Sequence, residues 1–309
     1  MRGDFAQEGS IVPGGLKPAH CTQFQVGGIS VQVGGDSCAD VALVSSMNLF
    51  RVEVGVPDIH IQIERASWLP INPGRPLFDS GSVWRLYEDR DGFQFDFSTP
   101  AMGERPYKRL IANREFDRAS LLISEECFAR DATTAAPLDY PLDELLIMHR
   151  LTKEKAIELH GCGIVRPDDT GNLFVGHSGA GKSTTTQLWM EREDVEILSD
   201  DRIIVRNDTR GMRMYGTPWH GEAAFASPES APLERIFILE HGCGNVLTRL
   251  SPSQAVAELF ARSFVPFHRH EYVDSALQFL QEVVDEVPCY RYSFEPDERA
   301  VERILNFRD

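Results

Sequence analysis

The stretch GHSGAGKS, residues 176–183, constrains the fold of this chain more than any other segment. It fits the pattern G-x-x-x-x-G-K-S, in which glycines curl the backbone so that successive amide N–H groups point toward a phosphate. The apolar residues Leu173, Phe174 and Val175 precede it, and a helical pattern follows it. Because the motif requires this order of strand, loop and helix, the sequence predicts a nucleotide-binding unit here.

The loop residues have separate expected roles. The Lys182 ammonium group can reach the β- and γ-phosphates, and the Ser183 hydroxyl can bind Mg²⁺. The positive end of the following helix adds to the attraction for phosphate. His177 occupies a variable position of the pattern, and we assign it no role. The residues predicted to contact the nucleotide are Gly176, Ser178, Gly179, Ala180, Gly181, Lys182, Ser183 and Thr184.

Two adjacent acids follow the phosphate loop. In VEILSDDRIIV, residues 195–205, Asp200 and Asp201 lie eighteen and nineteen residues after Lys182. Consecutive side chains of a strand face opposite sides, so both acids can serve one site only where the strand ends. A kinase needs a carboxylate for Mg²⁺ and a base for the proton of the attacking hydroxyl. The residues by themselves leave open which acid has which role.

Two further segments are candidates for the same site. His160, in ELHGCG, lies on a strand that should pair antiparallel with the strand before the loop, because only the short turn RPDDTG joins them. A structural histidine beside glycines is the alternative for His160. In GTPWHGE, residues 216–222, His220 and Glu222 are candidates for contact with metal or phosphate, and a tight turn packed by Trp219 is the alternative.

Taken together, the segments LHGCGIV, GNLFVGHSGAGKSTTTQLWM and VEILSDDRIIV resemble HPr kinase/phosphorylase, whose nucleotide-binding core is shared with phosphoenolpyruvate carboxykinase. The resemblance covers about residues 156–206. More weakly, the β-rich front and the helical tail are similar to the HPr kinase-like proteins of ribosomal-peptide gene clusters, including lasso-peptide kinases. The family implies transfer of a phosphoryl group to a serine hydroxyl.

The resemblance also implies roles for individual residues. Asp200 would be the general base, with His160 next to it. Lys182 would act at the transferred phosphate. The resemblance places Ser183 at the nucleotide, and it implies Asp201 and, by its downstream position, Glu222 as metal ligands beside the Ser183 hydroxyl that the motif predicts.

Several positions depart from the family. Thr184 stands where HPr kinases usually carry Glu, and Ser199 stands where they usually carry Ala. The downstream signature tied to phosphorolysis and the N-terminal domain of the HPr kinases have no clear match. These departures argue against HPr as the acceptor and against the reverse, phosphorylase reaction.

The hydrophobic pattern divides the chain into three parts. Residues 1–20 lack periodicity and are predicted to be a flexible arm, and residues 21–134 predict an antiparallel, β-rich accessory domain. Residues 135–309 predict an HPr kinase-like nucleotide-binding domain with a mixed sheet and C-terminal helices, so the expected fold class is α+β (mixed α/β). The local signals are a hairpin at Gly27-Gly28, alternation of Ile59, Ile61 and Ile63, a turn at Asp91-Gly92 and a helix that opens with Pro141 at its first position.

Composition excludes some partners. The chain has 31 basic and 47 acidic residues, a formal net charge of −16, which leaves no broad positive field for nucleic acid or an anionic membrane. Its six cysteines are widely spaced without a metal-ligand pattern, which favours reduced, structural thiols. No apolar signal core or membrane-length apolar run occurs, so we expect a cytoplasmic location.

The sequence therefore predicts an ATP- and Mg²⁺-dependent kinase acting on a hydroxyl, with serine as the implied residue, of a peptide, protein or small molecule. One alternative is a carboxykinase-like enzyme acting on an organic acid, although the chain is short for that class. Another is a nucleotide-sensing binding module, although a sensor has no need of the acid pair. Three roles are open for the N-terminal domain and for the helices after residue 251: acceptor recognition, formation of a homo-oligomer, or packing.

Overall fold

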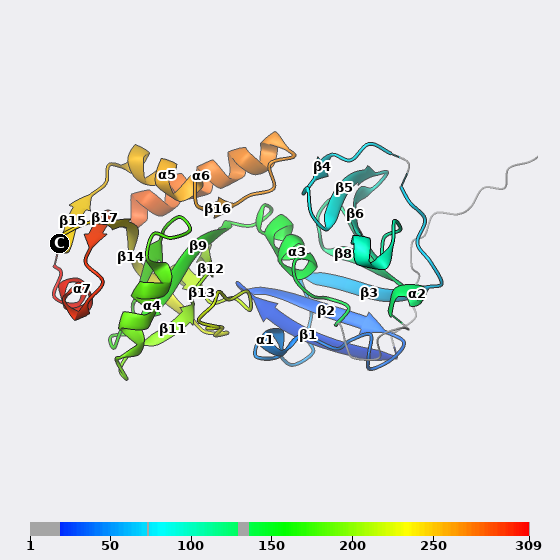
Figure 1. Ribbon diagram of the computed structural model, residues 1–309, viewed down its shortest axis with the longest axis horizontal. Coiled ribbons are helices and arrows are strands. Elements are labelled where there is room, and N and C mark those ends of the chain that lie inside the picture. Colours follow the sequence, from blue (N-terminus) through cyan, green and yellow to red (C-terminus); the bar gives the residue numbers. More distant parts are fainter. Residues whose placement is uncertain (1–18, 73, 129–135, 309) are drawn as a thin grey trace, which may run out of the picture.

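The computed structural model describes residues 19–72, 74–128 and 136–308 (Figure 1). These residues form helices and two large mixed sheets, with 22% of the residues helical and 38% in strands, so the expected α+β class is confirmed. The predicted arm falls mainly on residues 1–18 and the predicted domain boundary on residues 129–135, which lie outside the described residues. Among the described residues, no helix combines the length and apolar character that crossing a lipid bilayer requires.

The first sheet has eight strands in the order β1-β2-β3-β8-β7-β6-β5-β4. The hairpin predicted at Gly27 and Gly28 is confirmed, and these residues have φ of 59° and 75°, which glycine adopts without strain. Ile59, Ile61 and Ile63 are all buried, as their alternation predicts. The strands are β1 (His20–Val26), β2 (Ile29–Gly35), β3 (Ile59–Ala66), β4 (Phe78–Asp79), β5 (Trp84–Asp89), β6 (Gly92–Phe97), β7 (Lys108–Asn113) and β8 (Arg118–Ser124), and the short helices are α1 (Ser45–Asn48), η1 (Pro100–Met102) and α2 (Glu125–Phe128).

The expectation that the strands of residues 21–134 pair antiparallel is wrong at the centre of the first sheet. Strand β3 pairs in parallel with β2 on one side and with β8 on the other. Long connections join β3 to both partners, and parallel pairing requires such connections, whereas short turns mark only antiparallel hairpins.

The second predicted turn, at Asp91-Gly92, is displaced by one residue. Asp89 lies opposite Gly92, so Arg90 and Asp91 form the turn.

Helix α3 (Leu142–Leu151) belongs to the core of the first sheet. Its residues Leu142, Leu145 and Leu146 are buried in the same hydrophobic cluster as the inward-facing strand residues. The helix begins one residue later than predicted, because Pro141 is its N-cap. Figure 1 shows α3 between the two sheets. A helix anchored in one core therefore borders the other sheet.

The second sheet is organised around β9, which pairs with β10, β11, β12 and β16. The antiparallel pairing of β9 with β10 confirms the predicted short hairpin. Because β10 also pairs in parallel with β14, strands β9, β12, β13, β14 and β10 form a closed circuit. The strands are β9 (Ala156–Val165), β10 (Gly171–Val175), β11 (Glu196–Ser199), β12 (Arg202–Asp208), β13 (Gly211–Tyr215), β14 (Ser230–His241), β15 (Val246–Arg249), β16 (Ser263–Phe264) and β17 (Cys289–Phe294).

Helices cover both faces of this sheet. Helices α5 (Pro252–Phe260) and α6 (His270–Glu286) share one hydrophobic cluster with the strands, and this cluster includes Leu259 and Phe279. Helices α4 (Lys182–Met190) and α7 (Glu298–Leu305) share another, which includes Trp189 and Ile304. The helices predicted after Ser251 are thus present, and part of their surface packs against the sheet.

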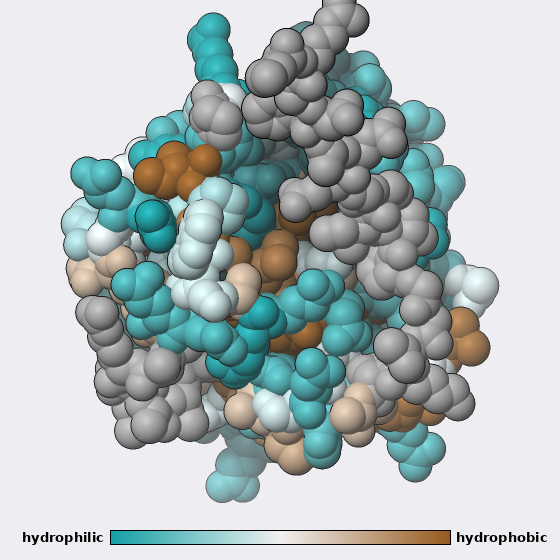
Figure 2. Space-filling view, turned by 90° about the vertical axis from the view of Figure 1, so that its right-hand side faces the viewer, coloured by the Kyte–Doolittle hydropathy of each residue, from teal (hydrophilic) through white to brown (hydrophobic). Residues whose placement is uncertain are grey.

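Figure 2 shows the end of the molecule formed by the first sheet. Most of the described residues visible in this view are hydrophilic, and hydrophobic residues form separate patches between them. Large hydrophobic side chains exposed in this half of the chain include Trp68, Leu77 and Phe78. Because hydrophilic residues interrupt these patches, we assign no docking surface to this face.

Candidate functional site

The segment between β10 and α4 is a curled loop. Gly179 and Gly181 have φ of 80° and 101°. A Cβ atom on Gly181 would lie 2.5 Å from the Phe294 ring, and one on Gly176 would lie 2.7 Å from the Cβ atom of Ala180. Backbone conformation and close packing therefore both require glycine in this loop, as in a phosphate cradle.

Lys182 lies inside the curl of the loop. Its side chain is buried, and Nζ donates hydrogen bonds to the carbonyl oxygens of Gly176 (3.0 Å) and His177 (3.2 Å). Burial lowers the pKa of the Lys182 ammonium group, and the negative charge of Asp201 acts in the opposite direction. The ammonium group and the Asp201 carboxylate therefore interact electrostatically within one site.

The first turn of α4 follows the loop directly. Its N-cap residue, Gly181, has no side chain, and none of the described side chains caps this end of the helix. The neighbouring residues Ser178 and Ser183 are exposed. Uncapped amide N–H groups at a helix N-terminus attract anions. The residues predicted to contact the nucleotide thus form one continuous loop and helix start.

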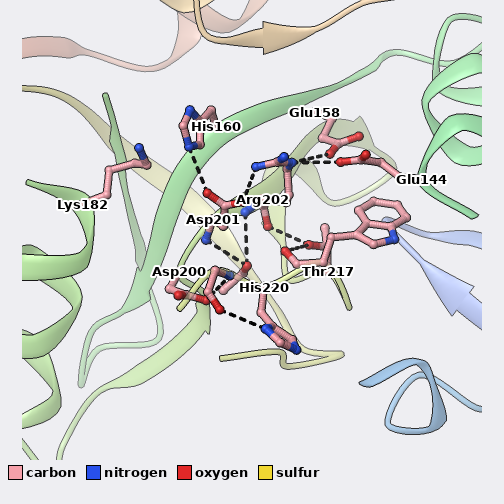
Figure 3. A network of polar contacts seen from close by, with 12 residues as sticks. Glu144, Glu158, His160, Lys182, Asp200, Asp201, Arg202, Thr217 and His220 are labelled. Carbon is pink, nitrogen blue, oxygen red and sulfur yellow. Dashed lines mark hydrogen bonds and ion pairs between the residues drawn. The ribbon is translucent and has the colours of Figure 1, made fainter. Parts of the chain in front are cut away.

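Asp200 and Asp201 occupy a gap between two strands. Strand β11 ends at Ser199 and β12 begins at Arg202, and both strands pair with β9. The acids therefore lie where a strand ends, as a shared role in one site requires. Figure 3 shows that the two carboxylates point to different neighbours. The structure thus distinguishes two acids that the sequence could not.

Asp200 is buried and holds a loop of the backbone. Its carboxylate accepts hydrogen bonds from the amide N–H groups of Gly221 (3.0 Å), Ala223 (2.9 Å) and Phe225 (3.3 Å). Thr217, at the start of the same segment, donates to the carbonyl oxygen of Arg202 (2.8 Å). These three backbone donors occupy most of the acceptor sites of the Asp200 carboxylate.

Asp201 is the acid that contacts the predicted histidine. His160 Nε2 lies 2.9 Å from Asp201 Oδ1, and the other carboxylate oxygen forms an ion pair with Arg202. Burial favours the neutral acid, but the hydrogen bond from His160 and the charges of Arg202 and Lys182 outweigh it. They hold the pKa of Asp201 below its ordinary value. The expectation that His160 lies next to Asp200 is therefore corrected, since its partner is Asp201.

Sequence reasoning missed Arg202. Its Nε lies 2.9 Å from Glu144 Oε1 and 3.5 Å from Glu158 Oε1, and its guanidinium group lies 4.1 Å from the centre of the Phe264 ring. The motif DDR contains the arginine and its neighbour Asp201, but its other partners are distant in the sequence. Only the pairing of β12 with β9 and the position of α3 bring them together.

The segment of residues 216–222 contributes its backbone. The Glu222 side chain is exposed and makes no hydrogen bond or ion pair with the described residues. His220 is also exposed, with Nδ1 3.0 Å from the Gly221 carbonyl oxygen. The described part of the chain contains no group of three or more His, Cys, Asp or Glu side chains placed to hold a metal. The role of Glu222 as a metal ligand therefore gains no support from its contacts.

His241 and Phe294 contact the glycine loop from the ends of two strands. His241 Nε2 lies 2.6 Å from the carbonyl oxygen of Gly179, and its ring stacks against that of Phe294. Both residues end strands, β14 and β17, that run in parallel beside each other. No motif in the sequence marks these two residues, because their role depends on strand pairing.

A buried acid beside this site gives a testable dependence on pH. Burial raises the pKa of Asp143 to about 7 from an ordinary 3.8. Between these two pKa values Asp143 is ionised in the unfolded chain and protonated in the folded protein. Its contribution to the free energy of unfolding therefore falls as pH rises, by up to about 1.4 kcal/mol per pH unit. We expect Asp143→Asn to remove this contribution, as measured by guanidinium unfolding between about pH 4 and 7.

The exposed Asp274 provides the control. Asp274→Asn should leave the slope of stability against pH as it is in the unmodified protein. If Asp143→Asn also left the slope unchanged, Asp143 would be ionised in the folded protein.

A scan against protein-family models and a search of curated proteins both found no match to this chain.

Proposed function

We propose that this protein is an ATP- and Mg²⁺-dependent kinase that transfers the γ-phosphate to a hydroxyl group, with serine as the favoured acceptor residue. The observation that carries the proposal is the meeting of two elements in one site. One is a curled glycine loop with a buried lysine, and the other is the His160–Asp201 pair, joined at 2.9 Å. The proposal agrees with the resemblance to HPr kinase/phosphorylase, and it includes a nucleotide and a hydroxyl-bearing acceptor as partners.

The loop provides the groups for binding phosphate. When ATP binds, Lys182 Nζ would exchange its carbonyl partners in the loop for phosphate oxygens, and the uncapped amides of α4 would donate to the same phosphates. Phosphoryl transfer needs little covalent chemistry from a protein, because positioning and charge stabilisation supply most of the rate. A preformed loop with its lysine already inside meets this need.

The available oxygen ligands fit Mg²⁺. This ion is usually bound by one or two carboxylates together with water and substrate phosphates, so a cluster of three protein ligands is not required. The Ser183 hydroxyl and the Asp201 carboxylate are the residues that would hold it. Bound there, Mg²⁺ would neutralise charge on the β- and γ-phosphates.

The geometry favours the His160–Asp201 pair as the proton acceptor. If Nε2 of His160 donates to Asp201, the lone pair of Nδ1 is free to accept the hydroxyl proton. The hydroxyl oxygen then bonds to the γ-phosphorus, the bond to the bridging oxygen breaks, and ADP leaves. Asp200 is less suited to this role, because three backbone N–H groups already bind its carboxylate.

Incubation with Mg-ATP tests the proposal. The protein would be mixed with serine-containing peptides, free serine or cell extract, and mass spectrometry would search for a gain of one phosphate. We expect an ATP-dependent product with the unmodified protein. ATP binding without transfer to any acceptor would instead favour a nucleotide-sensing module, and formation of phosphoenolpyruvate from oxaloacetate would favour a carboxykinase.

A further inference from the structure

We propose that Glu144 is a positioning residue of the transfer site, which acts through Arg202 to hold Asp201 and His160 in place. Glu144 stands on α3, whose apolar face lies in the core of the first sheet. The first sheet would therefore help to set the geometry of the site on the second. This inference rests on the proposed kinase function.

A continuous chain of contacts carries the inference. Glu144 Oε1 accepts from Arg202 Nε at 2.9 Å, Nη1 of the same guanidinium group pairs with Asp201, and Asp201 binds His160 (Figure 3). The Arg202 side chain is 14% exposed and that of Glu144 is 10% exposed, so water competes little for this ion pair. A change in the position of Glu144 would thus be transmitted to Asp201.

The neighbouring acid Glu158 does not replace Glu144. Its side chain is fully buried, and neither carboxylate oxygen has a hydrogen-bond partner among the described residues. Its Oε1 lies 3.5 Å from Arg202 Nε, farther than the 2.9 Å of Glu144 Oε1, and burial together with the negative charge of Glu144 raises the pKa of Glu158 well above its ordinary value. The carboxyl groups closest to the Arg202 guanidinium group are therefore those of Glu144 on one side and Asp201 on the other.

The position of Glu144 is itself fixed. The next residues of the helix, Leu145 and Leu146, are buried in the first-sheet cluster, which also contains Phe95 and Leu110. Close-packed cores deform little, so α3 can hold Arg202 in one orientation. Arginine has a planar fork of donors and binds two carboxylates at once, which suits it to this link.

Glu144→Gln tests the link with little change in shape. We expect kcat for transfer to fall by about 10- to 100-fold, because small misplacements of catalytic groups have effects of this size. The KM for ATP should remain within about twofold, since Glu144 does not touch the phosphate loop. Glu144→Asp retains a carboxylate and should therefore keep a higher kcat than Glu144→Gln. If Glu144 served only to stabilise the fold, the two variants would not differ in this way.

Glu154→Gln is the matched control. Glu154 is also a partly buried acid near α3, and it pairs with Arg150 (3.0 Å) and Arg206 (2.9 Å), away from Asp201. This variant should keep the kcat of the unmodified protein. An unchanged kcat in Glu144→Gln, or an equal loss in both variants, would overturn the inference. Should Glu144→Gln fail to fold, Arg202→Lys keeps the charge, removes the fork and should show the same loss of kcat.

Hydrogen exchange separates this inference from the proposed function. In Glu144→Gln without ligand, amides of residues 198–203 should exchange faster, while Glu154→Gln should leave them unchanged. Unchanged exchange in Glu144→Gln would overturn the positioning role even if the protein is a kinase. Absence of transfer by the unmodified protein would instead overturn the kinase, and the exchange data would still decide whether Glu144 holds this segment.

Discussion

Asp201→Asn is expected to lower the rate of phosphoryl transfer by about 10²- to 10⁴-fold, the usual contribution of acid–base catalysis. Asparagine has nearly the same shape but no charge, so it would bind Mg²⁺ poorly and would no longer stabilise a protonated His160. The phosphate loop does not depend on Asp201 for its backbone conformation, so the protein should still bind nucleotide. Initial rates at saturating Mg-ATP and a separate binding titration measure the two effects.

Asp200→Asn provides the comparison. Its carboxylate binds three backbone N–H groups, so its loss should reduce the free energy of unfolding by about 3 kcal/mol, the size of a charged hydrogen bond. Chemical denaturation measures this. Two results together would make Asp200 the base, as the resemblance to the HPr kinases implies. Asp200→Asn would be fully stable but without transfer activity, and Asp201→Asn would remain active.

Lys182→Met should reduce transfer by about 10²- to 10³-fold, comparable to the loss of one donor that stabilises transition-state charge. Methionine fills a similar volume but cannot donate to a phosphate. The stability of the ligand-free protein should change by no more than about 1 kcal/mol, because the loss of two hydrogen bonds is offset by removal of a buried charge. Transfer assays and thermal unfolding measure the two quantities.

Lys155→Met is the control, since Lys155 is exposed and pairs only with Glu282 on α6 among the described residues. It should transfer phosphate as the unmodified protein does. Transfer by Lys182→Met at the normal rate would show that the loop does not hold the transferred phosphate, and the proposed function would fall with it.

The parts predicted correctly from the sequence were those whose determinants are close together in the chain. Eight consecutive residues specify the glycine loop, and the hairpins at Gly27-Gly28 and between β9 and β10 depend on short turns. The parallel pairing of β3 was missed, because the residues next to a strand in the sequence do not indicate the direction of a partner strand that is distant in the sequence.

The candidate site was predictable in its composition and not in its contacts. The segment of residues 195–205 placed both acids shortly after the glycine loop in the sequence. Their different contacts depend on the break between β11 and β12 and on the backbone segment that donates hydrogen bonds to Asp200. Arg202 had no signal of its own, because Glu144 and Glu158 reach it only in the folded protein. Local patterns pointed to the candidate residues, and long-range packing determined which residue faces which.

The contacts of β9 and of the glycine loop with late segments of the chain have a consequence for folding during synthesis on the ribosome. Strand β9 pairs with β16, which follows it by about a hundred residues in the sequence, and Gly181 packs against Phe294 of β17. Such non-local pairings make folding slow, and translation adds only about 5–20 residues per second. In a nascent chain that already contains the glycine loop, this loop would therefore lack the packing against Phe294 until synthesis has passed β17.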